Sequence, residues 1–240
     1  MRKTLYDNRS AIVFDFDNTL FDYEKTEKEA LKKACECAGI FYSHELFVIF
    51  HRINQYLWNK CENGKAFDKR ILRTERFRIL FKAIGVDCTE SMIIKASDTY
   101  IIESCNGYLI ENVEQTIKTL RKLPILIGIA SSGFSYPRID KLKNSAIHDC
   151  FDFVLFREDF DILKPDVSFY YEIKMHCGRE NIIYIGDSFE SDIIASKQAG
   201  LDNIWFNYNK VHISDKHLEF CDYIVTDFKE IVNIIFQEEL

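Results

Sequence analysis

The sequence contains few of the residues that most often interrupt regular structure. It has only 9 glycines and 3 prolines in 240 residues, against the roughly 12% that the two make up in average proteins. This scarcity leaves room for long helices and excludes a collagen-like or linker-dominated chain. With 47% hydrophobic and 29% charged residues, the chain can bury the core of one large domain, or of a domain with a smaller companion.

Signals for several kinds of partner are also missing. The net charge is −7, without a basic surplus or stripe, so we expect no binding to a nucleic-acid polymer. No apolar run reaches the roughly 18 residues that span a bilayer, so we expect no membrane insertion. Residues 1–7 lack the apolar segment of a secretory signal. We therefore expect a cytoplasmic protein, while its oligomeric state stays open.

The 8 cysteines form no C-x-x-C pair, and their closest spacing is Cys35-Glu36-Cys37. Without an export signal, a disulfide framework is not expected, and we expect reduced and largely buried thiols. A zinc site is the alternative, but no ligand spacing favours it.

The hydrophobic pattern changes twice along the chain. An apolar run at residues 11–16 predicts a strand that is buried on both faces. From about residue 22 to 122 the period is helical, and four helices are expected at first. They run from a capping box at residues 26–29 to Gly39, from Ser43 onward, from Asp68 to Gly85, and from Thr89 to Cys105.

The rest of the chain alternates between helices and strands, which implies a doubly wound parallel sheet. Helices are expected near residues 112–122, 136–145, 167–176, 190–199 and 227–236. Strands are expected at residues 125–130, 153–156, 182–185, 203–206 and 223–225.

We therefore expect an α/β protein with a Rossmann-like core and an inserted, all-helical cap domain. The core would comprise residues 1–21 and 109–240, and the cap residues 22–108. Because the insert follows the first strand directly, it emerges at the carboxyl edge of the sheet, where open α/β sheets bind ligands. The insert is thus expected to cover the site.

Asp15 and Asp17 follow the first predicted strand. Residues two apart in an extended chain point to the same side, so each carboxyl group is expected to perturb the other. This pattern favours an ionised Asp15 as nucleophile or metal ligand, and Asp17 as the acid that protonates a leaving group. The alternative is an ordinary acidic turn after a strand.

Three further polar groups follow later strands. Ser131 and Ser132 can bind phosphoryl oxygens through hydroxyl and backbone N–H groups, and Lys164 can balance phosphate charge. Asp187 and Asp192 suit Mg²⁺, which prefers a few carboxylates and several waters. Each group alone is compatible with a turn, a solvated lysine or helix-start acids. Together they are expected at one edge of one sheet.

The four motifs of the haloacid dehalogenase-like superfamily are matched in order, by Asp15, Asp17 and Thr19, then Ser131, then Lys164-Pro165, then Gly186-Asp187 with Asp192. The chain resembles this superfamily over nearly its whole length, and its insert is similar to the helical cap of the first subgroup. The segment 57–64, Arg76-Phe77 and residues 200–207 resemble the pyrimidine 5′-nucleotidase branch. The second motif often reads Thr-Asn-Gly, whereas here it is Ser131-Ser132-Gly133.

The resemblance implies an Mg²⁺-dependent phosphatase that hydrolyses small phosphate monoesters through an aspartyl-phosphate. It implies that Asp15 is the nucleophile, that Asp17 protonates the leaving group and then activates water, and that Thr19 fixes the loop. The phosphate-binding residues would be Ser131, Ser132 and Lys164. The Mg²⁺ ligands would be Asp15, the Asp17 carbonyl, Asp187 and Asp192.

The leaving group is left open by the sequence. A nucleoside 5′-monophosphate is expected first, with a sugar-phosphate or phosphoglycolate-type phosphatase as the alternative. A phosphoryl-responsive binding module is the non-enzyme alternative, but such modules need neither a helical insert nor a second acid such as Asp17. An acid at this position also argues against dehalogenation, since the superfamily's dehalogenases lack it.

Trp58 and Arg76 are the cap residues that the resemblance places near the substrate, although Arg76 could instead be a surface residue paired with an acid. Six aromatic residues of the insert could stack on a nucleobase or simply pack in a helical bundle, which is the stronger alternative. They are Phe47, Phe50, Tyr56, Trp58, Phe77 and Phe81.

Overall fold

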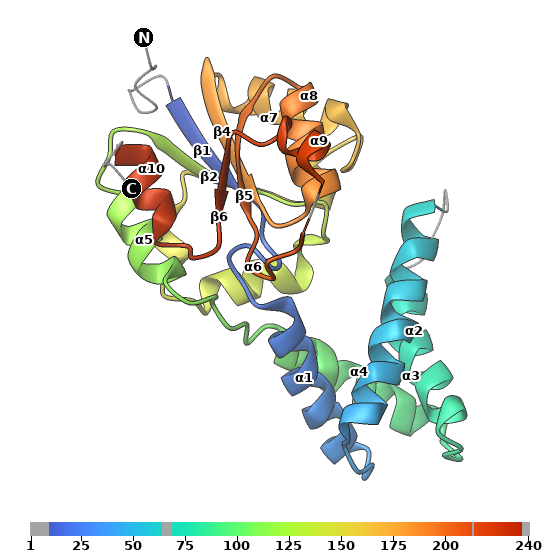
Figure 1. Cartoon of the computed structure of the whole chain (residues 1–240). Coiled ribbons are helices and arrows are strands. Elements are labelled where there is room, and N and C mark those ends of the chain that lie inside the picture. The colour runs from blue at the N-terminus through green and yellow to red at the C-terminus, as the bar shows by residue number, and fades with distance from the viewer. Residues whose placement is uncertain (1–9, 64–68, 213, 237–240) are drawn as a thin grey trace. The chain divides into compact units, whose positions relative to one another are not determined.

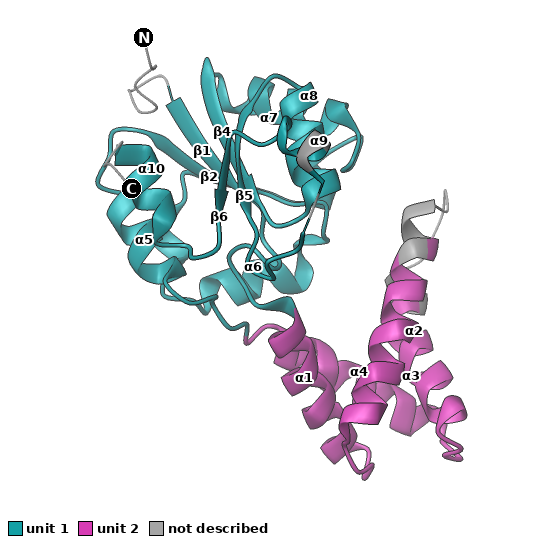
Figure 2. Ribbon diagram, viewed as in Figure 1, with its two compact units in different colours: residues 1–23, 107–240 teal, residues 24–106 magenta. Residues whose placement is uncertain are grey.

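The structure, a computed structural model, describes residues 10–63, 69–212 and 214–236. The chain forms two compact units (Figures 1 and 2). Unit 1 comprises residues 1–23 and 107–240, and unit 2 comprises residues 24–106. Unit 1 is therefore built from both ends of the sequence. Among the described residues, no helix is both long and apolar enough to cross a membrane.

Unit 1 contains the parallel sheet that the sequence predicts. Its six strands lie in the order β3-β2-β1-β4-β5-β6, and every neighbouring pair is parallel. All five residues of β1 are buried, as expected for a strand covered on both faces. The strands are β1 (Ser10–Phe14), β2 (Leu126–Ala130), β3 (Phe153–Leu155), β4 (Asn181–Gly186), β5 (Asp202–Phe206) and β6 (Tyr223–Val225).

Helices cover both faces of the sheet, which confirms the doubly wound α/β class (Figure 1). Ile12 of β1 lies in the core shared with α5, α6 and α10, whereas its neighbour Val13 lies in the core shared with α7 and α8. This alternation follows from the two-residue period of a strand. The helices are α5 (Val113–Leu120), α6 (Ser135–Lys143), α7 (Val167–Cys177), α8 (Ala195–Gln198), α9 (Asp215–Leu218) and α10 (Glu230–Phe236).

Unit 2 consists of helices around its own apolar core. The ring centroids of Phe50 and Phe77 lie 5.4 Å apart, and those of Phe77 and Phe81 5.9 Å apart. Aromatic pairs at this spacing stabilise a bundle beyond their buried area. The helices are α1 (Tyr23–Cys37), α2 (His44–Asn63), α3 (Lys69–Ala83) and α4 (Glu90–Ser104).

Two of the predicted helix starts are confirmed. Thr89 Oγ1 accepts a hydrogen bond from Met92 N at 3.3 Å, and Ser43 Oγ accepts one from Leu46 N at 3.1 Å. Each hydroxyl satisfies an N–H group that has no partner within its helix. Asp68, the predicted start of the third helix, lies outside the described residues.

The predicted capping box at residues 26–29 is wrong. Helix α1 begins earlier, at Tyr23, whose N–H donates to Asn18 Oδ1 at 3.3 Å. Glu27, which lies within that box, is buried among its neighbours: Asn54 Nδ2 donates to its Oε1 atom at 2.6 Å, and His51 Nδ1 lies 2.5 Å from its Oε2 atom. Thr26 therefore lies within helix α1 and is not its N-cap residue, while the Glu27 carboxylate binds partners on α2.

The strand order creates a topological switch point beside β1. After β1 the chain builds β2 and β3 on one side, and it then returns to build β4, β5 and β6 on the other. Strands β1 and β4 are adjacent while their onward connections leave in opposite directions. The carboxyl ends of two such strands are where open α/β sheets bind ligands.

Candidate active site

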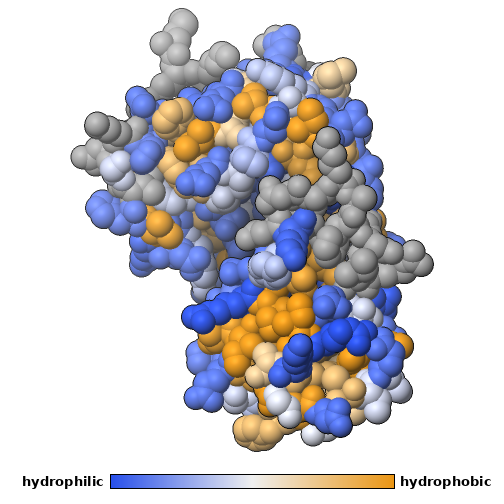
Figure 3. Space-filling view, turned by 90° about the vertical axis from the view of Figure 1, so that its right-hand side faces the viewer, coloured by the Kyte–Doolittle hydropathy of each residue, from blue (hydrophilic) through white to orange (hydrophobic). Residues whose placement is uncertain are grey.

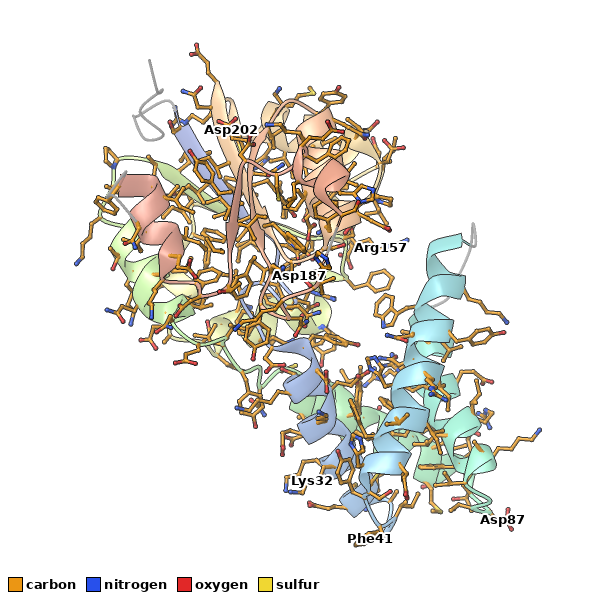
Figure 4. All side chains as sticks on the ribbon, in the orientation of Figure 1. Lys32, Phe41, Asp87, Arg157, Asp187 and Asp202 are labelled. Atoms are coloured by element: carbon orange, nitrogen blue, oxygen red, sulfur yellow. The ribbon has the colours of Figure 1, made fainter. Side chains whose placement is uncertain are left out.

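Asp15 and Asp187 directly follow the two strands at the switch point. The N–H group of Asp15 donates to Ile185 O at 2.8 Å, which extends the pairing of β1 with β4 by one residue. The two carboxylates therefore start from neighbouring strand ends. Figure 4 shows Asp187 at the opposite end of the sheet from Asp202, the first residue of β5.

Asp192 brings a third carboxylate to the same place. One oxygen from each of Asp15, Asp187 and Asp192 lies within 4.8 Å of the others. All three are acidic oxygen donors, and Asp15 and Asp192 are buried. The structure thus brings together three of the four residues that were predicted to hold a metal ion.

The chain after β4 is shaped around the Asp192 carboxylate. An α-helix was expected over residues 190–199, but the first part, Phe189–Ile194, is π-helical. Ser188 N donates to Asp192 Oδ2 at 2.9 Å, and a Cβ atom on Gly186 would overlap the Asp192 carboxyl group. The glycine is required here because the carboxylate approaches the backbone so closely.

Lys164 lies between two of these carboxylates. Its Nζ atom is 2.7 Å from Asp15 Oδ1 and 2.7 Å from Asp192 Oδ1, and it also donates to the Tyr184 hydroxyl at 3.3 Å. The Lys164 side chain is only 9% exposed. Asp187, the third carboxylate, lies within 4.8 Å of these two. When all three carboxylates are ionised, the charge of Lys164 balances one of them and two negative charges remain.

Burial and this excess of negative charge perturb both strand-end acids. Burial, reinforced by the charge of Asp192, raises the pKa of Asp15 to about 6 and that of Asp187 to about 8. Burial alone would lower the pKa of Lys164, but Asp15 and Asp192 outweigh it and raise that pKa well above its usual value. The site therefore carries stored charge repulsion, which a cation would relieve.

The carboxylate of Asp17 has different partners from that of Asp15. Its Oδ2 atom accepts hydrogen bonds from Arg138 Nε, at 2.8 Å, and from Arg138 Nη2, while its Oδ1 atom lies 3.4 Å from Lys141 Nζ. Burial alone would raise the pKa of Asp17, but these two cations outweigh it and lower the pKa. The Asp17 carboxylate is thus directed to α6, while that of Asp15 faces Lys164.

Thr19 lies in the tight turn after Asp17. The turn is closed by Leu20 N and Phe21 N, which both donate to Phe16 O, and Asn18 adopts a left-handed φ of 60°. The Thr19 hydroxyl is fully buried and, within the described part of the chain, has no hydrogen-bond partner. A role of Thr19 in fixing this loop stays a prediction.

Ser131 and Ser132 follow β2 at the same sheet edge. Ser131 is buried, and its N–H group donates to Leu155 O at 3.0 Å. Ser132 Oγ accepts a hydrogen bond from Lys164 N at 3.0 Å. This contact joins the second and third predicted motifs, so the serines and the lysine form one local structure.

Trp58 and Arg76 belong to unit 2. Arg76 is 5% exposed; its Nε atom donates to Leu72 O at 2.9 Å, and its guanidinium carbon lies 5.1 Å from the centroid of the Tyr100 ring. The alternative of a surface arginine is therefore wrong. Trp58 is partly buried against Leu57 and Leu72. A role of either residue in substrate recognition stays a prediction.

Four of the six aromatic residues considered for base stacking pack in the core of unit 2, which confirms for them the alternative of a packed helical bundle. They are Phe47, Phe50, Phe77 and Phe81. Tyr56 is 54% exposed, with Lys60 Nζ 4.7 Å from its ring centroid. Figure 3 shows apolar residues gathered on the viewed face of unit 2, whereas on unit 1 they are scattered among polar ones.

Arg138 and Lys141 were missed by the sequence analysis. A signal was present, because two cations three residues apart lie on one face of the predicted helix 136–145. Nothing in that spacing identified Asp17 as their partner, since it lies 121 residues away from Arg138 in the sequence. Only the packing of α6 near the end of β1 reveals the pairing.

The sequence model of one family, described as haloacid dehalogenase-like hydrolase, matches residues 12–206. The chain belongs to this family of hydrolases, which confirms the expected resemblance. An enzyme is thereby favoured over a binding module.

Curated relatives span nearly the whole chain. The pyrimidine 5′-nucleotidase PynA of Streptococcus pneumoniae is 24% identical over 227 residues, which cover 93% of this chain and 94% of PynA. The glyceraldehyde 3-phosphate phosphatase of Methanocaldococcus jannaschii is 28% identical over 234 residues, which cover 93% of this chain and 96% of that phosphatase. The expectation of a phosphoric monoester hydrolase agrees with these relatives.

Solved structures confirm the fold. The HAD-hydrolase YfnB of Bacillus subtilis, in a crystal form bound to magnesium, superposes with a TM-score of 0.79 at 23% identity. The match covers 95% of this chain and 99% of that one.

Proposed function

We propose that this chain is an Mg²⁺-dependent phosphatase that hydrolyses small phosphate monoesters through an aspartyl-phosphate on Asp15. The environment of Asp15 is the observation that carries the proposal. Its carboxylate follows a central strand, contacts Lys164 at 2.7 Å, and lies within 4.8 Å of two further carboxylates. A nucleophile, a counter-charge and a donor set for a hard cation therefore share one site.

The donor set fits Mg²⁺ in its chemistry. Asp15, Asp187 and Asp192 offer only oxygen atoms, which Mg²⁺ prefers, and the main-chain carbonyl of Asp17 is the further ligand that we propose. Together with Lys164, the three ionised carboxylates carry a net charge of −2, which one divalent cation would neutralise. When bound, Mg²⁺ would neutralise charge on the phosphoryl group and orient it.

In the first half-reaction, a carboxylate oxygen of Asp15 attacks the phosphorus atom. A bond from Asp15 to phosphorus forms as the bond from phosphorus to the ester oxygen breaks, and Asp17 gives its proton to the departing alkoxide. Ser131, Ser132 and Lys164 hold the phosphoryl oxygens. Positioning and charge neutralisation supply most of the catalysis in phosphoryl transfer.

In the second half-reaction, Asp17 takes a proton from a water molecule. The oxygen of this water attacks the phosphorus atom of the aspartyl-phosphate, which releases inorganic phosphate and restores the carboxylate of Asp15. One proton is thus donated and one recovered by Asp17 in each turnover.

For the leaving group we propose a nucleoside, so that the substrate is a nucleoside 5′-monophosphate. The relationship to the pyrimidine 5′-nucleotidase PynA over 93% of the chain supports this choice. A phosphorylated sugar is the second candidate, because the glyceraldehyde 3-phosphate phosphatase of M. jannaschii is similar over the same share of the chain. Both are small phosphorylated metabolites.

A substrate panel tests this proposal. Phosphate release is measured with pyrimidine and purine nucleoside 5′-monophosphates, triose and hexose phosphates, and phosphoglycolate, each with Mg²⁺ and with EDTA. We expect turnover with Mg²⁺ only, and the highest kcat/KM on a nucleotide. A higher kcat/KM on a sugar phosphate would instead identify a sugar phosphate as the substrate. Absence of turnover on every ester would overturn the proposed function.

A further inference from the structure

Two cations, Arg138 and Lys141, contact Asp17 but take no direct part in the proposed half-reactions. Arg138 donates from both Nε and Nη2 to the same oxygen, Oδ2. The Arg138 and Asp17 side chains are 13% and 17% exposed. A hydrogen-bonded ion pair so shielded from water fixes geometry far better than an exposed pair does.

Arg138 is itself held by the loop that follows β2. Its Nη1 atom donates to Phe134 O at 3.1 Å. Its guanidinium group lies against the backbone of Gly133, where a Cβ atom would overlap the guanidinium carbon. The last residue of the Ser131-Ser132-Gly133 triplet therefore provides the space that Arg138 occupies. Through Arg138, the proposed phosphate-binding loop is joined to Asp17.

Lys141 contacts the other oxygen of Asp17 only loosely. Its side chain is 4% exposed, and its Nζ atom lies 5.7 Å and 5.6 Å from the ring centroids of Phe16 and Phe21. At 3.4 Å, the contact with Oδ1 is at the limit of a hydrogen bond. Oδ1 is consequently the more available of the two Asp17 oxygens.

We propose that Arg138 is a positioning residue for Asp17: it anchors Oδ2 so that Oδ1 carries the proton to the leaving group and later removes one from water. The inference rests on the proposed function and deepens it. Lys141 supports the same arrangement from the other side of the carboxylate. Arg138 acts through Asp17 and contacts neither the phosphoryl group nor the leaving group.

The two half-reactions give this role a distinctive kinetic signature. A nucleoside leaves as a basic alkoxide that needs a proton, whereas 4-nitrophenolate leaves without one. A misplaced Asp17 therefore slows formation of the aspartyl-phosphate from the nucleotide but not from 4-nitrophenyl phosphate. Attack of water on the intermediate needs Asp17 with either ester, so it slows in both cases.

The experiment compares kcat/KM on a nucleoside 5′-monophosphate and on 4-nitrophenyl phosphate, because this ratio reports the first half-reaction. Arg138→Met removes the anchor. Arg138→Lys keeps the positive charge but places a single nitrogen atom where Nε and Nη2 both donate to Asp17 Oδ2. Lys143→Met is the matched control, since Lys143 lies on the same helix and its side chain is 70% exposed.

We expect Arg138→Met to lower kcat/KM on the nucleotide about 100-fold, within the range of general acid catalysis, and Arg138→Lys to lower it less. We expect less than a threefold change on 4-nitrophenyl phosphate, with a burst of 4-nitrophenolate that matches the enzyme concentration. Retained activity on this ester also shows that each variant is folded.

Equal losses of kcat/KM on both esters in Arg138→Lys would overturn the inference, because Arg138 would then act on the phosphoryl group. Unchanged values on both esters would overturn it as well. If the wild-type protein hydrolyses neither ester, it is the proposed function that fails.

Discussion

Lys164 Nζ lies 2.7 Å from Asp15 Oδ1, although 149 residues separate the two in the sequence. This single contact joins the loop after β1 to the segment that precedes α7. It also places a cation beside the carboxylate that we propose as the nucleophile. This pairing and the charges around it determine how the site responds to substitution, to pH and to Mg²⁺.

Lys164→Met leaves three neighbouring carboxylates without their cation. Removing one partner of a buried ion pair costs about 3 kcal/mol or more, so we expect a loss of this size in the free energy of unfolding in EDTA. Urea denaturation measures it, with Lys143→Met as the exposed control. We expect Mg²⁺ to restore part of the loss, and a Lys164→Met protein as stable as wild type in EDTA would contradict the charge arrangement.

The stability of the metal-free protein should fall as the pH rises. Asp187 has a folded pKa of about 8, above its value of 3.8 in the unfolded chain. The folded state thus keeps a proton that the unfolded state releases between these pH values. We expect a loss on the order of 3 kcal/mol between about pH 5 and pH 8 in EDTA.

Thermal denaturation across this pH range checks the sign. Asp187→Asn should flatten the decline, while Asp202→Asn, at the other end of the sheet, should not. Mg²⁺ affinity should rise over the same range, since only the ionised carboxylates bind the cation. A metal-free protein that becomes more stable toward pH 8 would show that these carboxyl groups are not perturbed as described.

Gly186→Ala tests the close approach of Asp192 to the backbone. The new Cβ atom would overlap the Asp192 carboxyl group, so we expect Asp192 to move and Mg²⁺ affinity to fall about tenfold, as for other disturbed metal sites. Isothermal titration with Mg²⁺ measures the change. Gly178→Ala, at the end of α7, is the control, because a Cβ atom there would meet no atom of a neighbouring residue. Unchanged affinity in Gly186→Ala would remove Asp192 from the proposed ligands.

Arg76→Met tests the interior of unit 2. Because Arg76 is buried, donates to Leu72 O and lies over the Tyr100 ring, we expect it to lose about 2 kcal/mol of unfolding free energy. Arg73→Met, whose side chain is 44% exposed beside Asp98, should change it by less than about 0.5 kcal/mol. Urea denaturation distinguishes the two, and similar effects would show that Arg76 is not structural.

Local patterns were enough to predict most of the fold. Every predicted strand is present, because runs such as residues 11–14 and 182–185 combine burial with β-branched residues. Helix ends were less predictable: α1 begins at Tyr23, whose N–H group donates to Asn18 Oδ1, and this contact depends on the tight turn around Asn18. The π-helical turn at Asp192 likewise depends on Ser188 and Gly186.

In the site, too, some features could be predicted from the sequence and others depend on tertiary packing. The rule that parallel strands end at one edge was sufficient to predict that Asp15, Lys164 and Asp187 lie together. The contacts of Asp17 with Arg138 and Lys141 were not predictable, because they depend on how α6 packs near the end of β1. Roles for Trp58 and Arg76 rest on resemblance and stay predictions.

Identification of the phosphorylated residue tests the central claim most directly. The protein is mixed with a radiolabelled phosphate ester and Mg²⁺, quenched in acid within milliseconds, reduced with tritiated borohydride and digested. Borohydride converts an aspartyl-phosphate to homoserine, so the account predicts tritium in the peptide that contains Asp15, and none in Asp15→Asn. Steady phosphate release without label at position 15, or turnover that persists in Asp15→Asn, would contradict the account.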